Sequence, residues 1–228
     1  MANNATAGYG CRQTMTVGNT PATGGQSEFT VQGGGSPGAT KAIFKGAPVA
    51  MQTAAGGAGV LGHIQDHTAA LMTDGIVRGN TWAHNTANTN GSLGVFNGAT
   101  FVDANGKPTW TNGLAAAQTS SVDYNTGSNN ITAFVNTNPH QEYTARADAA
   151  VGIASFNTLT NTGYNLNDAG AGVDGQSDCT LDIANTTGTA NYMWKLVRSA
   201  NVTNQNDLTA AGADIIISYN PQANAYLA

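Results

Sequence analysis

The sequence predicts an all-β protein: a short-stranded antiparallel β-barrel or β-sandwich with long Gly/Asn/Thr-rich loops and an extended N-terminal arm. Gly, Asn and Thr make up roughly 37% of the 228 residues. Thr favours strands, while Asn and Gly supply the positive φ angles of tight turns. Charged residues are 9% of the chain, where about 25% is typical, which excludes charge-paired helices and coiled coils. Short apolar segments also recur between closely spaced turn signals, as in barrels and sandwiches.

The domain organisation follows from where those segments lie. We expect an extended arm over residues 1–27 and a β-rich domain over 28–228, within which 52–91 form a long loop or insertion. Residues 54–62 repeat Gly among small side chains, which disfavours a helix. Disorder is the competing interpretation for such a composition, but a hydrophobic content of 40% favours a folded core.

The first predicted strands are short. Residues 28–31 and 40–46 are separated by a Gly/Pro break at 33–38, and 48–51 continue after a bend at Gly46-Ala47.

Asn-Gly pairs dominate the next region, at 90–91, 97–98, 105–106 and 112–113. Asn-Gly is the strongest short-range hairpin signal, because both residues tolerate the positive φ of a type I′ turn. We therefore expect a meander of three strands at 93–96, 99–103 and 107–110.

A further hairpin is predicted around Asn138-Pro139-His140, a turn signal that separates alternating residues 131–136 from a strand at 141–147. Three strands then close the chain, at 178–183, 192–198 and 213–219. In the second of these, simple alternation places Tyr192, Trp194, Leu196 and Arg198 on one face. In the third, residues 215–217 are an unbroken run of Ile, which is typical of a strand covered on both sides.

Charge and hydropathy argue against two classes of partner. The net charge is −5, and eight scattered basic residues cannot displace the counterions of a nucleic acid. No apolar run approaches the ~20 residues that span a bilayer, and the N-terminus lacks a basic and an apolar signal region. We expect no nucleic acid, no membrane and no secretory signal.

The most suggestive local motif is His63-Ile64-Gln65-Asp66-His67, which has the spacing of an inverted zinc-protease signature with Asp in place of Glu. Zinc chemistry would need His63 and His67 on one face of a helix, and the preceding Gly-rich segment supports a helix poorly. A polar surface segment is the better interpretation. His84 and His140 are isolated, and a lone His beside a turn is usually structural or solvated.

Other candidate ligands are equally sparse. Asp174, Asp178 and Asp182 could offer oxygens to calcium, but they do not follow a binding-loop pattern. Cys11 and Cys179 match no metal or redox spacing, and the sequence leaves a disulfide between them open. We predict no catalytic, cofactor-binding or metal-binding residue, no cofactor and no enzyme.

Several ordered segments share a pattern with one protein family. They include Gly46-Ala47-Pro48-Val49 and Trp194-Lys195-Leu196-Val197-Arg198, together with residues 17–31, 94–110 and 133–143. In these segments, which are spread over most of its length, the chain resembles the small capsid-associated structural proteins of tailed bacteriophages, particularly marine ones. One departure is Ala47, where that family pattern has Asp, whose side chain could close an Asx-type turn.

The resemblance implies a capsid decoration or cement protein, or a minor head structural protein. Its expected partners are the phage major capsid protein and other copies of itself, as a homotrimer at capsomer junctions. Its expected location is the outer surface of the capsid in the virion, after synthesis in the host cytoplasm. A tail or head fibre component is an alternative, although no repeats occur. A carbohydrate-binding β module is another, with Trp82, Trp110 and Tyr124 as available aromatics.

Overall fold

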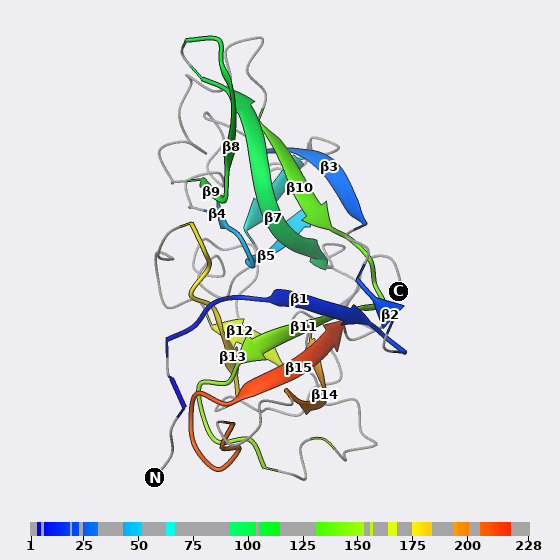
Figure 1. Ribbon diagram of the computed structural model, residues 1–228, viewed down its shortest axis with the longest axis vertical. Coiled ribbons are helices and arrows are strands. Elements are labelled where there is room, and N and C mark those ends of the chain that lie inside the picture. Colours follow the sequence, from blue (N-terminus) through cyan, green and yellow to red (C-terminus); the bar gives the residue numbers. More distant parts are fainter. Residues whose placement is uncertain are drawn as a thin grey trace, which may run out of the picture.

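The computed structural model describes the residue ranges 4–5, 7–18, 20–22, 25–31, 43–51, 63–66, 92–103, 105–114, 131–152, 156, 164–167, 175–183, 194–200 and 206–219. Within these ranges the chain forms strands in two stacked halves (Figure 1). The predicted all-β fold class is confirmed.

The lower half in Figure 1 is built on a five-stranded antiparallel sheet, here called the lower sheet. Its order is β14 (Trp194–Ser199), β15 (Asp214–Tyr219), β11 (Gln141–Arg146), β1 (Arg12–Thr16) and β2 (Thr20–Pro21). A small antiparallel pair contacts it, made of β12 (Asn165–Asn167) and β13 (Thr180–Asp182). Single bridges join this pair to the lower sheet at two places, Leu181 to Ala147 just after β11, and Tyr164, just before β12, to Trp194 of β14.

The upper half contains the upper sheet, with six strands. Its order is β10 (Thr132–Asn136), β3 (Gln26–Val31), β6 (His63–Asp66), β5 (Pro48–Met51), β7 (Ser92–Val102) and β8 (Pro108–Thr111). Strand β10 pairs with β7 as well as with β3, so the sheet curls back on itself. The β3–β6 pairing is parallel and the others are antiparallel. A separate pair, β4 (Ile43–Phe44) with β9 (Gly113–Leu114), contacts β7.

Each half has its own hydrophobic core. The core of the lower half contains Trp194, Tyr143 and Tyr219, together with Ile215 and Ile217. Ile216 is also buried, so the expectation that the Ile run is covered on both faces is confirmed. The core of the upper half is formed of aliphatic side chains and one aromatic ring: Ile43, Val49, Phe96, Ala99, Leu114, Ile131, Ala133 and Val135.

The described part of the predicted N-terminal arm is built into the domain. Strand β1 pairs with β11, and Tyr9 and Cys11 just before it are buried. Burial alternates only weakly from Arg12 to Thr16, so the local pattern does not identify a strand. The strand is formed by pairing with β11, which lies about 130 residues away in the sequence. The predicted loop at 52–91 contains β6, and its other residues lie outside the described ranges.

The predicted turn at Asn97-Gly98 is wrong. Strand β7 runs continuously through both residues, and its register with β10 shifts so that Asn97 is an extra residue opposite the step from Phe134 to Val135. Asn-Gly here forms a β-bulge, for which the positive φ of Gly98 (139°) is equally suited. The Asn-Gly pair at 105–106 does make the predicted turn, between β7 and β8.

The predicted hairpin at Asn138-Pro139-His140 is also wrong. Strand β10 belongs to the upper sheet and β11 to the lower sheet, and the two do not pair. The turn carries the chain from one sheet to the other. Both edges of β10 are paired, with β3 and β7, and both edges of β11 are paired, with β1 and β15. This crossover places the end of β10 directly above the start of β11 (Figure 1).

A second bulge overturns the predicted face of Arg198. Leu196 pairs with Ile217 and Arg198 with Ile216, so Val197 is an extra residue that moves Arg198 to the opposite face from Leu196. There its Nη1 atom contacts the buried carboxylate of Glu142 at 2.7 Å.

The turn at Ala47 does not depend on a side chain. The backbone N–H of Ala47 donates to the carbonyl of Phe44 at 2.9 Å, and Ala47 itself is buried. An aspartate at this position would therefore lie in the interior, where its charge would need a partner.

Candidate functional site

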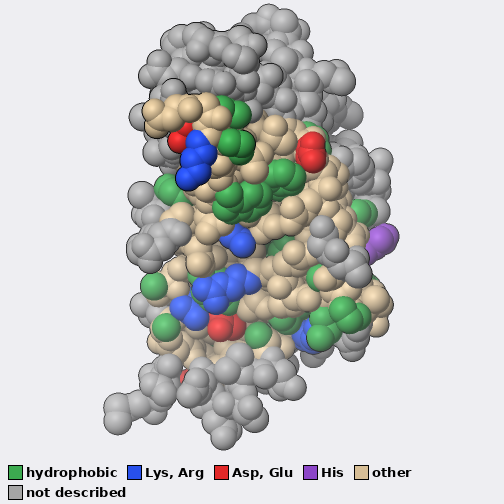
Figure 2. Space-filling model, turned by 45° about the horizontal axis from the view of Figure 1, so that its top comes forward, with side chains coloured by type: hydrophobic (Ala, Val, Ile, Leu, Met, Phe, Trp, Pro, Cys, Tyr) green, Lys and Arg blue, Asp and Glu red, His purple; other side chains and the backbone are tan. Residues whose placement is uncertain are grey.

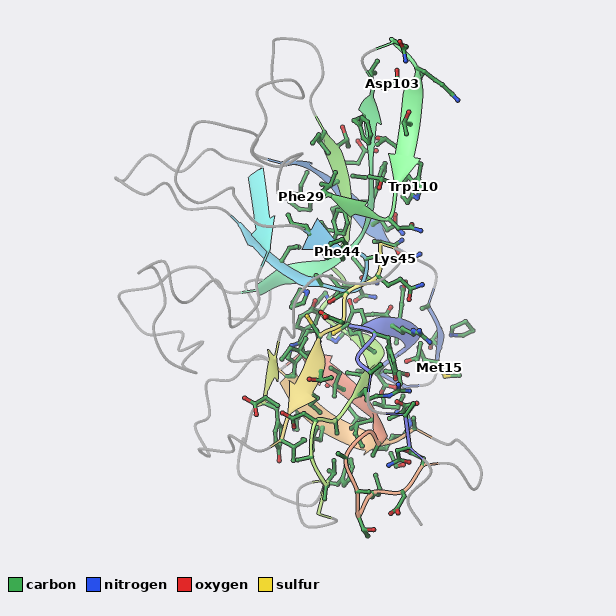
Figure 3. The ribbon with its side chains drawn as sticks, turned by 90° about the vertical axis from the view of Figure 1, so that its left-hand side faces the viewer. Met15, Phe29, Phe44, Lys45, Asp103 and Trp110 are labelled. Carbon is green, nitrogen blue, oxygen red and sulfur yellow. The ribbon has the colours of Figure 1, made fainter. Side chains whose placement is uncertain are left out.

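Three large hydrophobic side chains are exposed among the described residues: Met15 (41%), Val17 (57%) and Trp110 (50%). Met15 and Val17 lie at the β1–β2 turn of the lower sheet, and Trp110 lies on β8, at the edge of the upper sheet. Figure 3 shows Trp110, Lys45 and Met15 along the same side of the molecule. Figure 2 shows this face with basic groups between two hydrophobic patches. Apolar anchors of both sheets therefore share one surface.

Trp110 is held in place by its neighbours on the upper sheet. Its ring lies directly over Gly98, the bulge glycine of β7, and packs against Phe134 of β10 with ring centroids 5.3 Å apart. The indole N–H also donates to the side-chain oxygen of Asn112 at 3.1 Å. Trp110 is thus a fixed aromatic platform, and Gly98 leaves the room that it occupies.

The two sheets meet where residues 9–11 cross residues 45–47. The N–H of Cys11 donates to the carbonyl of Gly46, and the N–H of Gly46 donates to the carbonyl of Phe96, each at 2.8 Å. Gly10 and Gly46 both have positive φ, 69° and 90°. A Cβ atom on Gly10 would lie 2.8 Å from the Gly46 carbonyl oxygen, so the crossing requires glycine.

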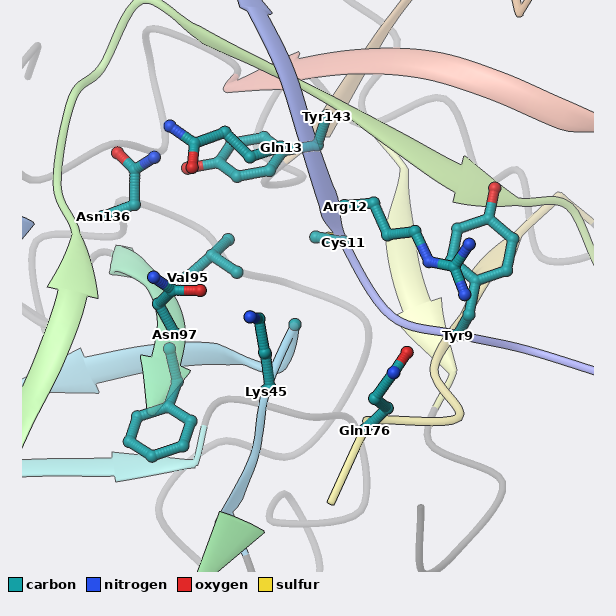
Figure 4. A pocket seen from close by; sticks show the side chains of 12 residues that line it. Tyr9, Cys11, Arg12, Gln13, Lys45, Val95, Asn97, Asn136, Tyr143 and Gln176 are labelled. Atoms are coloured by element: carbon teal, nitrogen blue, oxygen red, sulfur yellow. The ribbon is translucent and has the colours of Figure 1, made fainter. Parts of the chain in front are cut away.

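A cleft of about 510 Å³ lies beside this crossing (Figure 4). Both sheets contribute to its walls, through Tyr9, Cys11, Arg12, Gln13, Lys45, Gly46, Val95, Phe96, Asn97, Asn136, Tyr143 and Gln176. None of these described lining residues is acidic, and two carry a positive charge. The bulge at Asn97 and the crossover after Asn136 direct two of the carboxamides to the cleft.

Tyr9 organises the basic groups at one end of the cleft. The guanidinium groups of Arg12 and Arg146 lie 4.1 and 4.7 Å from the centre of its ring, at cation–π distance. Arg146 also forms an ion pair with Asp214 at 3.0 Å, and the Tyr9 hydroxyl donates to the same carboxylate. Burial, followed by the charge of Asp214 and this hydrogen bond, raises the pKa of Tyr9 well above its ordinary value. Tyr9 therefore stays neutral.

The structure does not arrange the zinc-like motif on a helix. His63–Asp66 forms strand β6, and His67 lies outside the described residues. A strand advances about 3.3 Å per residue, so residues four apart do not share a ligand position as they do on a helix. No group of three or more His, Cys, Asp or Glu among the described residues could hold a metal ion.

The remaining sequence candidates lie apart from the cleft or outside the described residues. Asp178 precedes β13 and Asp182 is the last residue of this strand, where it is buried; Asp174 is not described. His140 is exposed in the crossover turn, where its N–H donates to Asn138. His84, Trp82 and Tyr124 are also outside the described ranges. In the described ranges no helix is long and apolar enough to cross a membrane.

Cys11 and Cys179 both lie in the core of the lower half, and no disulfide joins them. The hydroxyl of Ser177 donates to the Cys179 sulfur at 2.9 Å, and burial raises the pKa of the Cys11 thiol. The pair that the sequence left open is therefore reduced in this structure. A buried thiol with a raised pKa, such as that of Cys11, is a poor nucleophile.

Sequence reasoning missed the cleft, because its residues come from six separate segments. A weak signal was available in two glycines, because Gly46 directly follows Lys45 and Gly10 stands two residues before Arg12. Nothing in the sequence indicates that these two segments lie side by side in the fold. In comparisons with protein-family models, curated proteins and solved structures, none matches this chain. Its function has to be argued from the surfaces described above.

Proposed function

We propose that the chain is a non-enzymatic structural protein of a phage virion, which binds the outer surface of the capsid and stabilises it. The observation that carries the proposal is the shared face on which Trp110, Met15 and Val17 are exposed (Figure 3). The identity of the partner, the major capsid protein, rests on the resemblance of the sequence to capsid-associated phage proteins.

The residue types on this face suit a protein–protein interface. Trp, Met and Arg are enriched at the centres of interfaces, whereas Lys, Glu and Asp are depleted there. Trp110 and Arg12 are both held by ring contacts, to Phe134 and Tyr9 respectively. Side chains fixed before binding lose little conformational entropy on docking, which favours affinity.

A decoration protein works by contact area repeated over a symmetric shell, and it needs no reactive group. The two-sheet fold supports this use. The β1–β2 turn of the lower sheet and the edge strand β8 of the upper sheet present their apolar residues at separate heights on one face. A partner surface that contacts both positions would span both sheets.

Co-sedimentation tests the proposal. The purified chain is mixed with shells assembled from the major capsid protein alone, and binding is measured as saturable recovery with the shells. We expect wild-type protein to bind and to raise the temperature at which the shells break. Trp110→Ala should weaken binding by about 30-fold, the loss typical of an interface hot spot.

Lys107→Ala is the matched control, because Lys107 is exposed in the β7–β8 turn near the Trp110 strand. A rim lysine contributes little, so its loss should leave binding nearly unchanged. Failure of the wild-type chain to bind shells, or density for it confined to the tail in electron microscopy of virions, would contradict the proposal. The second result would favour a tail fibre component instead.

A carbohydrate-binding module is the second candidate, and one observation favours it. Trp110 is half-exposed, rigidly held and paired across the strand with Thr100, as in a platform for stacking a sugar ring. Glycan-array binding that Trp110→Ala abolishes would support this candidate. Equal array signals from wild type and Trp110→Ala would exclude the platform.

A further inference from the structure

We propose that the cleft between the two sheets binds an acidic sugar, a ring that carries one carboxylate and several hydroxyls. The cleft opens on the same face as Trp110, between the exposed apolar residues of the two sheets, but the inference rests on the lining of the cleft and not on capsid binding.

The first step is the unbalanced charge of the cleft. Arg12 and Lys45 line it, and the ion pairs among the described residues, Arg146–Asp214 and Arg198–Glu142, involve neither of them. Figure 4 shows the Lys45 ammonium pointing into the middle of the cavity, between Asn97 on one side and Gln176 on the other. Such a site attracts an anion, and a carboxylate would accept charge-assisted hydrogen bonds from it.

The second step is a buried donor without a partner. Asn136 is only 3% exposed and lines the cleft, and its Nδ2 atom has no hydrogen-bond partner. Its orientation is fixed, because the Oδ1 atom accepts the backbone N–H of Asn138 at 3.1 Å. Leaving a buried N–H unpaired costs free energy, so a ligand oxygen at this position would be recognised.

The third step concerns the size and the other polar groups. A volume of about 510 Å³ falls in the range of small-molecule sites and is far larger than a bare acetate or phosphate needs. Asn97 and Gln176 supply carboxamides, each able both to donate and to accept. The hydroxyl groups of a sugar likewise both donate and accept hydrogen bonds, so they match these carboxamides. The buried side chain of Val95 offers an apolar wall for the carbon atoms of the sugar ring.

The backbone holds the central lysine independently of its side chain. The N–H of Lys45 donates to the carbonyls of Asn112 and Gly175, at 2.8 and 3.0 Å, and its carbonyl accepts the N–H of Ser177. Substituting the side chain therefore leaves these contacts intact. Lys45→Gln removes the charge while the fold is retained, as unfolding curves can verify.

Calorimetric titration of the full chain tests the inference, with galacturonate as the probe. We expect saturable binding of galacturonate, and at least about tenfold weaker binding of galactose, acetate and phosphate, since each lacks part of the recognised chemistry. Lys45→Gln should weaken galacturonate binding at least about tenfold. Lys107→Gln, an identical change at an exposed site outside the cleft, should leave it unchanged.

A galacturonate oligomer distinguishes the two sources of an acidic sugar, a polysaccharide and a free monosaccharide. Tighter binding of the oligomer indicates a residue within a polysaccharide, and tighter binding of the monomer indicates a free sugar; both support the proposal. It is overturned if wild-type protein does not bind galacturonate, if acetate binds as well as galacturonate, or if Lys107→Gln and Lys45→Gln weaken binding equally. Shell co-sedimentation is a separate readout and can fail or succeed independently.

Discussion

In the lower half three aromatic side chains are buried together, whereas in the upper sheet the aromatic pair lies on the outer face. Trp194 stacks on Tyr219 with centroids 4.6 Å apart, and Tyr143 meets both rings edge-on. Trp110 and Phe134 have a comparable contact at 5.3 Å, but Trp110 is half-exposed. Contacts between aromatic rings therefore stabilise the core of the lower half, whereas in the upper sheet one ring of such a pair is exposed to solvent.

The difference indicates that the two halves contribute unequally to the stability of the fold. The core of the upper half consists of aliphatic side chains and Phe96, whereas the core of the lower half contains more buried residues and encloses three large rings. Burial of more apolar surface gains more free energy. The lower half therefore supplies the larger share of packing. The upper sheet leaves Trp110 half-exposed, so this side chain contributes less to stability than the enclosed Trp194.

The largest effect that tests this comparison is expected at Trp194. Trp194→Ala leaves a cavity in the lower core and should lower the free energy of unfolding by about 3–5 kcal/mol. Trp110→Ala removes the same side chain from the surface and should cost less than about 1 kcal/mol. Denaturant unfolding of both variants measures the difference. Equal losses of unfolding free energy would contradict the unequal contributions of the two halves.

Gly98→Ala should have an intermediate effect, confined to the upper sheet. A Cβ atom there would collide with the Trp110 ring, and the φ of 139° disfavours alanine. We expect a loss of about 2 kcal/mol in unfolding free energy. In the double variant with Trp110→Ala the collision disappears, so the two losses should be less than additive. Strict additivity would show that Trp110 does not rest on Gly98.

Arg198→Met probes a polar contact of the lower sheet. It leaves the Glu142 carboxylate buried without its cation, at an expected cost of about 1–2 kcal/mol, reduced because Arg198 is 43% exposed. Lys195→Met on the same strand is the control, since Lys195 is exposed and should change stability by less than about 0.5 kcal/mol. Similar results for both variants would mean that the ion pair contributes nothing.

The smallest effect is a pH dependence centred on Cys11. Burial raises the pKa of this thiol in the folded state, so the unfolded chain releases its proton first, from about pH 8.5. Folding stability should therefore fall as the pH rises above that value, by up to about 1.4 kcal/mol per pH unit for one thiol. Cys11→Ala should show a shallower fall between about pH 8.5 and 9.5, before tyrosines ionise. Parallel curves for wild type and variant would contradict this.

The fold class and most strands could be predicted because they depend on local pattern. Alternation identified β10, and the Ile run identified β15 together with its burial on both faces. The bulges at Asn97 and Val197 could not be predicted, since a bulge is defined by the partner strand that lacks the extra residue. Each bulge redirected a side chain that matters, Asn97 to the cleft and Arg198 to Glu142.

By itself the sequence determined that the chain folds as short strands with Gly/Asn turns, because strand propensity and turn chemistry act over a few residues. The tertiary structure decided which sheet each strand joins. It thereby brought Arg12 and Arg146 together around Tyr9 and placed Lys45 in the same cleft as Arg12, although these residues are scattered in sequence. It also decided that Trp110 is displayed and Trp194 enclosed. Those outcomes depend on pairings between distant segments, whose free energy is gained only when both partners are already in place.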